Sequence, residues 1–122
     1  MGYIRHNAIV VTTWDEKRMG AAVDKAHEIG LSFIGPSADV VNGYRTMMVI
    51  PDGSKEGWDE SEYGDTRRQA FRDWLDTYIH GDGSSPFEWV EIAYGHDDHS
   101  AEVVDSHWER NPVIADPEAS TP

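Results

Sequence analysis

The chain has 122 residues, no cysteine and a formal net charge of −13 at pH 7. This length suits one domain with one modest core, and the lack of cysteine excludes disulfides, cysteine-based zinc sites and thiol catalysis. The excess of carboxylates excludes direct binding to nucleic acids and anionic membranes, because both are recognised through lysine and arginine.

The first predicted elements are a strand and an amphipathic helix. β-branched residues in a short apolar run predict a strand over 7–13. A helix is predicted over 14–29, where Thr13 and Glu16 have the spacing of a capping box. Gly30 occupies the place of a left-handed C-terminal cap. One apolar stripe with a period of about 3.6 is formed by Met19, Ala22, Val23, Ala26 and Ile29.

A hairpin is predicted next. Asn42-Gly43 lies between two apolar runs, and this pair favours a two-residue turn because both residues accept positive φ. We therefore expect strands over 32–41 and 44–50. Gly35-Pro36 must interrupt the first strand and confine it to an edge or a bulge, because proline donates no ladder hydrogen bond. Pro51-Asp52-Gly53 then ends the second strand as a turn.

A long loop, a second helix and a further strand follow. Residues 51–65, "PDGSKEGWDESEYGD", indicate a glycine-rich acidic loop. The helix is expected within "GDTRRQAFRDWLDTYIHG", where Thr66 and Gln69 repeat the capping-box spacing, or one turn earlier. Alternation in "FEWVEIAY" predicts a strand over 87–94, and a short strand is expected near 101–105.

The expected order, β-α-β-β-α-β, indicates an α+β fold. Split β-α-β units of this kind build the ferredoxin-like two-layer sandwich, which has two helices on one face of an antiparallel sheet. We expect residues 1–98 to form this domain. Residues 99–122 hold few apolar side chains, so we expect an acidic C-terminal extension that is peripheral or partly disordered.

A small anion site is one hypothesis for the long loop. Its glycines would let backbone N–H groups face an anion, and the helix N-terminus beyond adds partial positive charge. Arg68 and Arg72 would share one face of that helix, and an aromatic ring could stack on a base. The alternative is that the rings pin the loop to the core while the arginines pair with nearby carboxylates. The ligand-binding candidates are Gly53, Lys55, Gly57, Trp58, Tyr63, Arg67 and Arg68.

The run "HDDH" at 96–99 is a metal hypothesis. Imidazoles and carboxylates suit zinc or a harder divalent ion, so His96, Asp98 and His99 are candidate ligands of a metal-dependent hydrolase. Neighbouring side chains of an extended chain point to opposite sides, so such a site needs a turn and help from His6 or His107. The alternative is a solvated loop. The sequence has no G-x-S-x-G, H-E-x-x-H or P-loop motif, so we expect no enzyme and no cofactor.

Acidic residues are concentrated toward the C-terminus. Residues 1–80 carry 13 acidic and nine basic side chains, whereas 81–122 carry ten acidic side chains and Arg110. Such a field favours a partner with a basic surface, although acidity also serves solubility. No apolar run reaches the length of a membrane span and no signal peptide is recognisable, so a cytoplasmic location is expected. A homo-oligomer is compatible with these features.

The chain resembles short acidic proteins encoded by bacteriophages and prophages. The resemblance rests on "HNAIVVTTWDEK", "VNGYRTMMVIPDGSKEGWDES" and "WVEIAYGHDD", and it spans roughly residues 5–98. It implies no activity, cofactor or catalytic residue. It implies a viral context, in which such proteins act on a host protein or sequester a defence signal.

Three functions are expected from these observations. The first is a non-enzymatic binding protein in the host cytoplasm, which engages a basic surface of a host protein and serves counter-defence. The second is a module that binds a phosphorylated small molecule such as a nucleotide signal. The third is the metal-dependent hydrolase.

Overall fold

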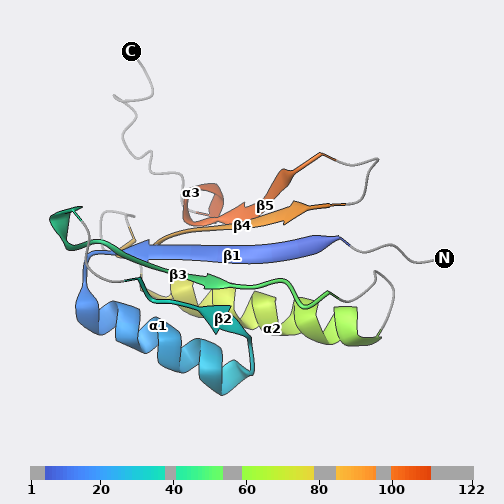
Figure 1. Ribbon diagram of the computed structural model, residues 1–122, viewed down its shortest axis with the longest axis horizontal. Coiled ribbons are helices and arrows are strands. Elements are labelled where there is room, and N and C mark those ends of the chain that lie inside the picture. Colours follow the sequence, from blue (N-terminus) through green and yellow to red (C-terminus); the bar gives the residue numbers. More distant parts are fainter. Residues whose placement is uncertain (1–4, 38–40, 54–58, 79–84, 96–99, 111–122) are drawn as a thin grey trace, which may run out of the picture.

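The protein has a mixed α+β fold (Figure 1). The computed structural model describes residues 5–37, 41–53, 59–78, 85–95 and 100–110. These residues form one five-stranded antiparallel sheet and three α-helices, which confirms the expected α+β class. The elements are β1 (His6–Thr13), α1 (Glu16–Ile29), β2 (Phe33–Ile34), the 3-10 turn η1 (Val41–Gly43), β3 (Arg45–Val49), α2 (Asp59–Asp76), β4 (Glu88–Tyr94), β5 (Glu102–Ser106) and α3 (His107–Arg110).

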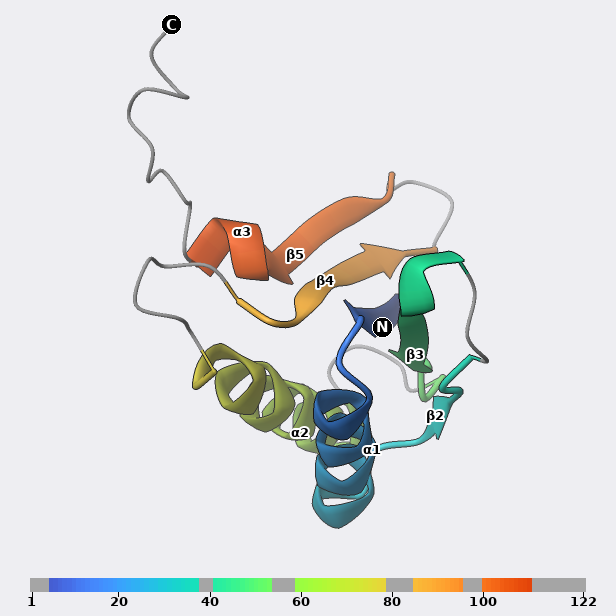
Figure 2. The ribbon, with the colours of Figure 1, turned by 90° about the vertical axis from the view of Figure 1, so that its left-hand side faces the viewer.

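β1 is the central strand of the sheet, whose order is β2-β3-β1-β4-β5. It pairs antiparallel with β3 and β4, in registers that set Val10 opposite both Met48 and Val90. Figure 2 shows α1 and α2 on the same side of the sheet. Side chains alternate between the two faces of a strand, and odd-numbered residues of β1, β3 and β4 contribute to the core beneath these helices. Even-numbered residues of these strands therefore face away from the helices.

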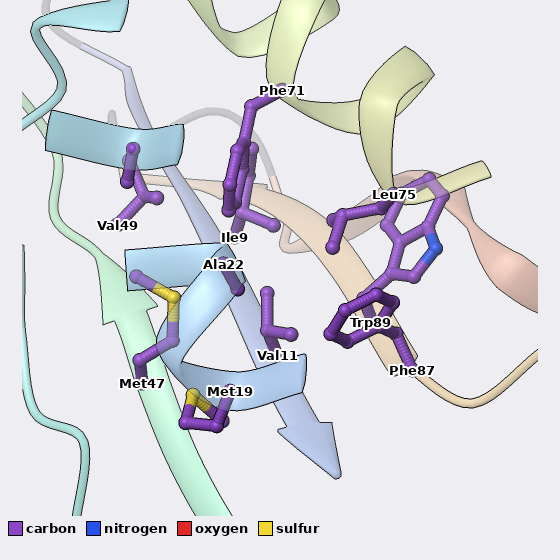
Figure 3. Packing of buried hydrophobic residues seen from close by; sticks show 11 residues of the cluster. Ile9, Val11, Met19, Ala22, Met47, Val49, Phe71, Leu75, Phe87 and Trp89 are labelled. Carbon is purple, nitrogen blue, oxygen red and sulfur yellow. The ribbon is translucent and has the colours of Figure 1, made fainter. Parts of the chain in front are cut away.

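The core lies between the two helices and the sheet (Figure 3). α1 contributes Met19 and Ala22, and α2 contributes Phe71 and Leu75. Burying each large apolar side chain stabilises the fold by about 1.5–3 kcal/mol. This packing fixes the face of α2 that meets the sheet. On the sheet side, the core residues are Ile9, Val11, Met47, Val49 and Trp89, together with Phe87 just before β4.

The N-terminus of α1 is capped by Asp15. Asp15 Oδ1 accepts hydrogen bonds from the backbone N–H groups of Lys17 and Arg18, at 3.0 and 3.2 Å. The expected capping box of Thr13 is wrong, because Thr13 is the last residue of β1. The N-cap position is two residues later, at Asp15. The C-terminal cap is confirmed, since Gly30 is left-handed with φ of 94°.

The expected tight hairpin around Asn42-Gly43 is wrong. Both residues do have positive φ, 63° and 74°, but β2 already ends at Ile34. β2 ends there because Gly35 has a left-handed φ of 97°, which a strand does not accommodate. Glycine is required at this position, since a Cβ would lie 2.8 Å from the carbonyl oxygen of Thr46. The expectation that Gly35-Pro36 confines this strand to an edge is confirmed, since β2 is the edge strand beside β3.

α2 begins at Asp59, earlier than the expected start near Thr66. The Thr66 hydroxyl donates to the carbonyl of Glu62 at 3.0 Å, so it lies inside the helix and caps nothing. Asp59, the first residue of the helix, favours this start because its carboxylate interacts well with the helix dipole. The expected loop over 51–65 is therefore wrong for 59–65, and Gly64 is a buried helical residue.

The sheet continues beyond residue 98, where we expected the domain to end. The strand expected near 101–105 is confirmed as β5, which pairs antiparallel with β4 and contains a bulge opposite Glu91 and Ile92. α3 follows directly, and Arg110 at its end contacts α2 through Asp73 at 3.0 Å. Residues 102–110 are thus part of the folded domain.

Candidate functional site

A polar cleft lies between α2 and β5. Its floor is formed by the N-terminal half of β1 and the C-terminal half of β4, and its volume is about 460 Å³. Sites for small molecules typically occupy about 300–1,000 Å³. Its charged and amide lining residues include Arg5, Asn7, Arg68, Arg72, Glu91 and Glu102. We call this space the α2–β5 cleft.

Glu91 forms the floor of the cleft. It lies on the helix-facing side of β4, between Trp89 and Ala93, and is only 2% exposed. One carboxylate oxygen accepts from Asn7 Nδ2 at 3.0 Å and from Arg68 Nε at 3.2 Å. The other accepts from Arg72 Nη1 at 2.7 Å. These three bonds offset the cost of burying a charge beside the apolar core.

Arg68 is surrounded by carboxylates. Besides Glu91, its guanidinium hydrogen bonds to Asp65 and lies 3.9 Å from Asp52. Gly64 permits this approach, because a Cβ at that position would lie 2.5 Å from Asp52 Oδ2. An arginine whose neighbours are three carboxylates has little positive potential left to attract a phosphate.

Arg5 joins the two ends of the segment that connects β4 to β5. Its Nη1 donates to the carbonyl of Gly95 at 2.9 Å, and its Nη2 donates to the carbonyl of Ser100 at 2.8 Å. Nη2 also contacts Glu102 Oε1 at 3.3 Å. The hydrogen-bond capacity of Arg5 is therefore largely used within the protein.

Arg72 is paired less completely. Its single hydrogen bond within the described residues goes to Glu91, and its Nε is buried with no acceptor. The nearest carboxylate oxygen, Asp105 Oδ2, is 3.7 Å from this Nε, beyond hydrogen-bond distance. Asp105 instead accepts from Arg110 Nε at 2.9 Å.

Arg110 fastens α3 to the domain. Its guanidinium bonds to Asp105 and Asp73 and stacks over the Trp89 ring at 5.5 Å from the ring centroid. Burial alone would lower the pKa of Arg110, but its hydrogen bonds with Asp105 and Asp73 outweigh burial and raise that pKa above its ordinary value. Arg110 therefore remains charged throughout the usual pH range.

The structure describes four of the seven candidate ligand residues of the long loop. Tyr63 is 60% exposed on α2, and Gly53 has a left-handed φ of 75° after β3. Arg67 and Arg68 line a smaller cleft of about 100 Å³ beside Asp52. Arg68 also lines the α2–β5 cleft. The remaining candidates, Lys55, Gly57 and Trp58, lie outside the described residues.

The candidate metal ligands His96, Asp98 and His99 also lie outside the described residues. Of the two histidines considered as helpers, His107 accepts from the backbone N–H of Trp89 at 3.0 Å, and His6 contacts the Tyr94 ring. The described part of the chain holds no cluster of three or more histidines and carboxylates placed for a metal ion. No helix within it combines the length and the apolar content that crossing a bilayer requires.

Sequence reasoning missed several residues of the cleft. Arg5, Asn7 and Glu91 were not candidates, and their meeting depends on the pairing of β1 with β4. One available signal was the position of Glu91 in "FEWVEIAY", where it shares its face with Phe87 and Trp89. A charged residue on the same side of a strand as two large aromatics predicts a buried, paired charge.

The sheet has a second notable surface on the side away from α1 and α2. A row of apolar residues crosses four strands there, with Ile34 opposite Met48, Met48 opposite Val10, and Val10 opposite Val90. A neighbouring row sets Ala8 opposite Ile92 and Ile92 opposite Val103. Ile34 and Val103, at the two edges, are each 55% exposed, whereas the residues between them are half-buried and Ala8 is buried. We call these two rows the open face.

Comparisons of the chain with models of protein families, with curated proteins and with solved structures found no match.

Proposed function

We propose that the chain is a non-enzymatic binding protein that engages a protein partner through the open face. The supporting observation is the pair of apolar rows that cross the sheet opposite the two helices. Exposed and half-buried apolar residues that adjoin on one face of a small domain are typical of an interaction site.

A basic partner is favoured by charge. The formal net charge is −13, and the described strands present Glu88 on the same face as the apolar rows. A second copy of this chain would bring the same negative charge against itself, whereas a basic protein would be steered toward the surface. The resemblance to phage proteins favours a host protein in the bacterial cytoplasm as this partner, with counter-defence as the role.

The strand order supports assigning the first four strands and two helices to the ferredoxin-like sandwich. β3 lies between β1 and β2, and β1 lies between β3 and β4, so both β-α-β units are split by an antiparallel strand. α1 and α2 lie on one face, as such a sandwich requires. In this proposal β5 extends the sheet at one edge and widens the open face.

Affinity capture from bacterial lysate tests the proposal. The partner is identified by mass spectrometry at low salt, purified, and then tested for direct binding to the full chain. We expect a basic protein that binds directly and is released at high salt. Ile34→Glu and Val103→Glu place a charge on the open face and should each weaken binding at least tenfold.

Tyr63→Glu is the matched control, because Tyr63 is similarly exposed but lies on α2, on the other side of the sheet. It should leave binding unchanged. The proposal fails if no purified partner binds directly, or if the open-face variants bind it as well as the wild type does. A native mass twice that of the chain, abolished by Val103→Glu, would make a second copy the occupant and also overturn it.

A further inference from the structure

Arg72 is an almost buried cation with unused hydrogen-bond donors. Its side chain is 12% exposed, and a guanidinium carries five N–H donors. Within the described residues it donates one hydrogen bond, from Nη1 to Glu91. Its Nε is buried without an acceptor, since Asp105 lies 3.7 Å away and bonds to Arg110. The described side chains around Arg72 therefore leave part of its donor capacity unused.

The charge of the α2–β5 cleft limits the kind of ligand that could supply those oxygens. Three arginines and three carboxylates line it, so its formal charges cancel. Arg5 and Arg68 are already engaged by backbone carbonyls and carboxylates, so they cannot neutralise a phosphate dianion. A single carboxylate group fits better, because it carries one negative charge and accepts charge-assisted hydrogen bonds from a guanidinium.

The two walls of the cleft also offer acceptors for a positive group. Asp65 on α2 and Glu102 on β5 both line the cleft, and both side chains are 64% exposed. Ala93 and Val104 add apolar surface between them and the floor. The cleft thus has an arginine with unused hydrogen-bond donors near its floor and accessible carboxylates on its walls.

We propose that the α2–β5 cleft binds a small zwitterion of the α-amino-acid class. Arg72 holds the ligand carboxylate through Nη2, which donates to no described residue, and the ligand ammonium group lies toward Asp65 and Glu102. A volume of about 460 Å³ accommodates an amino acid together with ordered water. This site lies on the helix side of the sheet and is independent of the open face.

Thermal shift and isothermal titration calorimetry on the full chain test this site. The probes are free α-amino acids, each beside the matching carboxylic acid without the amine and the matching amine without the carboxylate. Inorganic phosphate and adenosine monophosphate complete the panel. We expect at least one amino acid to raise Tm by several degrees at saturation, with its two fragments at least tenfold weaker and phosphate without effect.

Two variants locate the site. Arg72→Lys keeps the positive charge but loses the planar guanidinium, and it should weaken binding of the amino acid at least tenfold. Val104→Phe fills the cleft from its exposed β5 wall without touching the arginine network, and it should abolish binding. Glu62→Gln removes a carboxylate from the exposed surface of α2 outside the cleft, and it should bind as the wild type does.

The outcomes are separable. If Arg72→Lys does not fold, as judged by near-UV circular dichroism, Val104→Phe decides the question. The proposal is overturned if no amino acid shifts Tm, if phosphate or the nucleotide binds more tightly than any amino acid, or if Val104→Phe binds as the wild type does. Loss of binding in Val104→Phe with retention in Glu62→Gln supports it.

Discussion

Arg72 Nη1 lies 2.7 Å from Glu91 Oε1, and this bond joins α2 to the floor of the sheet across 19 residues of sequence. Arg68, one helical turn earlier, donates from Nε to the other oxygen of the same carboxylate at 3.2 Å. Phe71 and Leu75 enter the core from neighbouring positions of this helix. The polar bonds and the apolar packing therefore set the same rotation of α2 on the sheet.

Replacing Glu91 with glutamine should lower the free energy of unfolding by about 3–5 kcal/mol, because two nearly buried arginines would lose their shared counter-charge. Urea denaturation followed by circular dichroism measures this change. Glu88→Gln alters the same strand at an exposed position and should change stability by less than about 0.5 kcal/mol. A loss below about 1 kcal/mol in Glu91→Gln would show that Asp65 and Asp105 suffice as counter-charges for the two arginines.

The local elements were predictable because their signals depend on nearby residues. The stripe from Met19 to Ile29 has one period, and Gly30 ends it, so α1 follows from sequence alone. The start of α2 was not predictable in this way. Gly64 suggested a loop, whereas in the fold it is the helical position where Asp52 approaches Arg68. This glycine is therefore explained by a tertiary contact, which leaves no pattern in the neighbouring sequence.

The cleft was less predictable than the elements around it. The spacing of Arg68 and Arg72 correctly placed both on one face of a helix. Their partner Glu91 comes from β4, and Arg5 comes from before β1, so the site depends on the strand order. Charge counting could not show that two acidic residues of the C-terminal region, Glu91 and Asp105, are paired with arginines inside the domain.

The two glycines inside the helices should respond differently to alanine. Gly20→Ala in α1 should raise the free energy of unfolding by about 0.5–1 kcal/mol, because a Cβ there meets no atom within 4 Å. Gly64→Ala should give no such gain, because its Cβ would lie 2.5 Å from Asp52 Oδ2 and displace that side chain. Thermal and urea unfolding measure both. Equal stabilisation by the two changes would contradict the close approach at Gly64.

Removing the N-terminal cap of α1, Asp15, should lower the stability of the protein. Asp15→Ala leaves the N–H groups of Lys17 and Arg18 without their acceptor and should lower stability by about 1 kcal/mol. Asp15→Asn keeps a side-chain acceptor and should lower stability by only a few tenths of the loss expected for Asp15→Ala. Asp24→Ala, at an exposed position in the middle of α1, is the control for loss of a carboxylate. Should Asp24→Ala be as costly as Asp15→Ala, helix charge rather than capping would explain the effect.

Arg110 should stabilise the domain by an amount that does not change between neutral pH and about pH 11. Its pKa is raised in the folded protein, so the linked stabilisation is complete below the ordinary pKa and is lost only as pH rises through the still higher folded value. Arg110→Ala should lower the free energy of unfolding by about 1–2 kcal/mol, through loss of the Asp73 and Asp105 bonds and of the contact with Trp89.

Arg110→Lys separates charge from geometry in this cluster. Lysine titrates near pH 10.4 in model peptides, about two units below arginine, so this variant should approach the stability of Arg110→Ala as pH rises past about 10. Wild type and variants share their remaining lysines and tyrosines, so differences between their unfolding curves at each pH isolate position 110. A wild-type advantage over Arg110→Ala that shrinks between pH 7 and about pH 10 would mean that other titrating groups, rather than Arg110, hold α3 against the sheet.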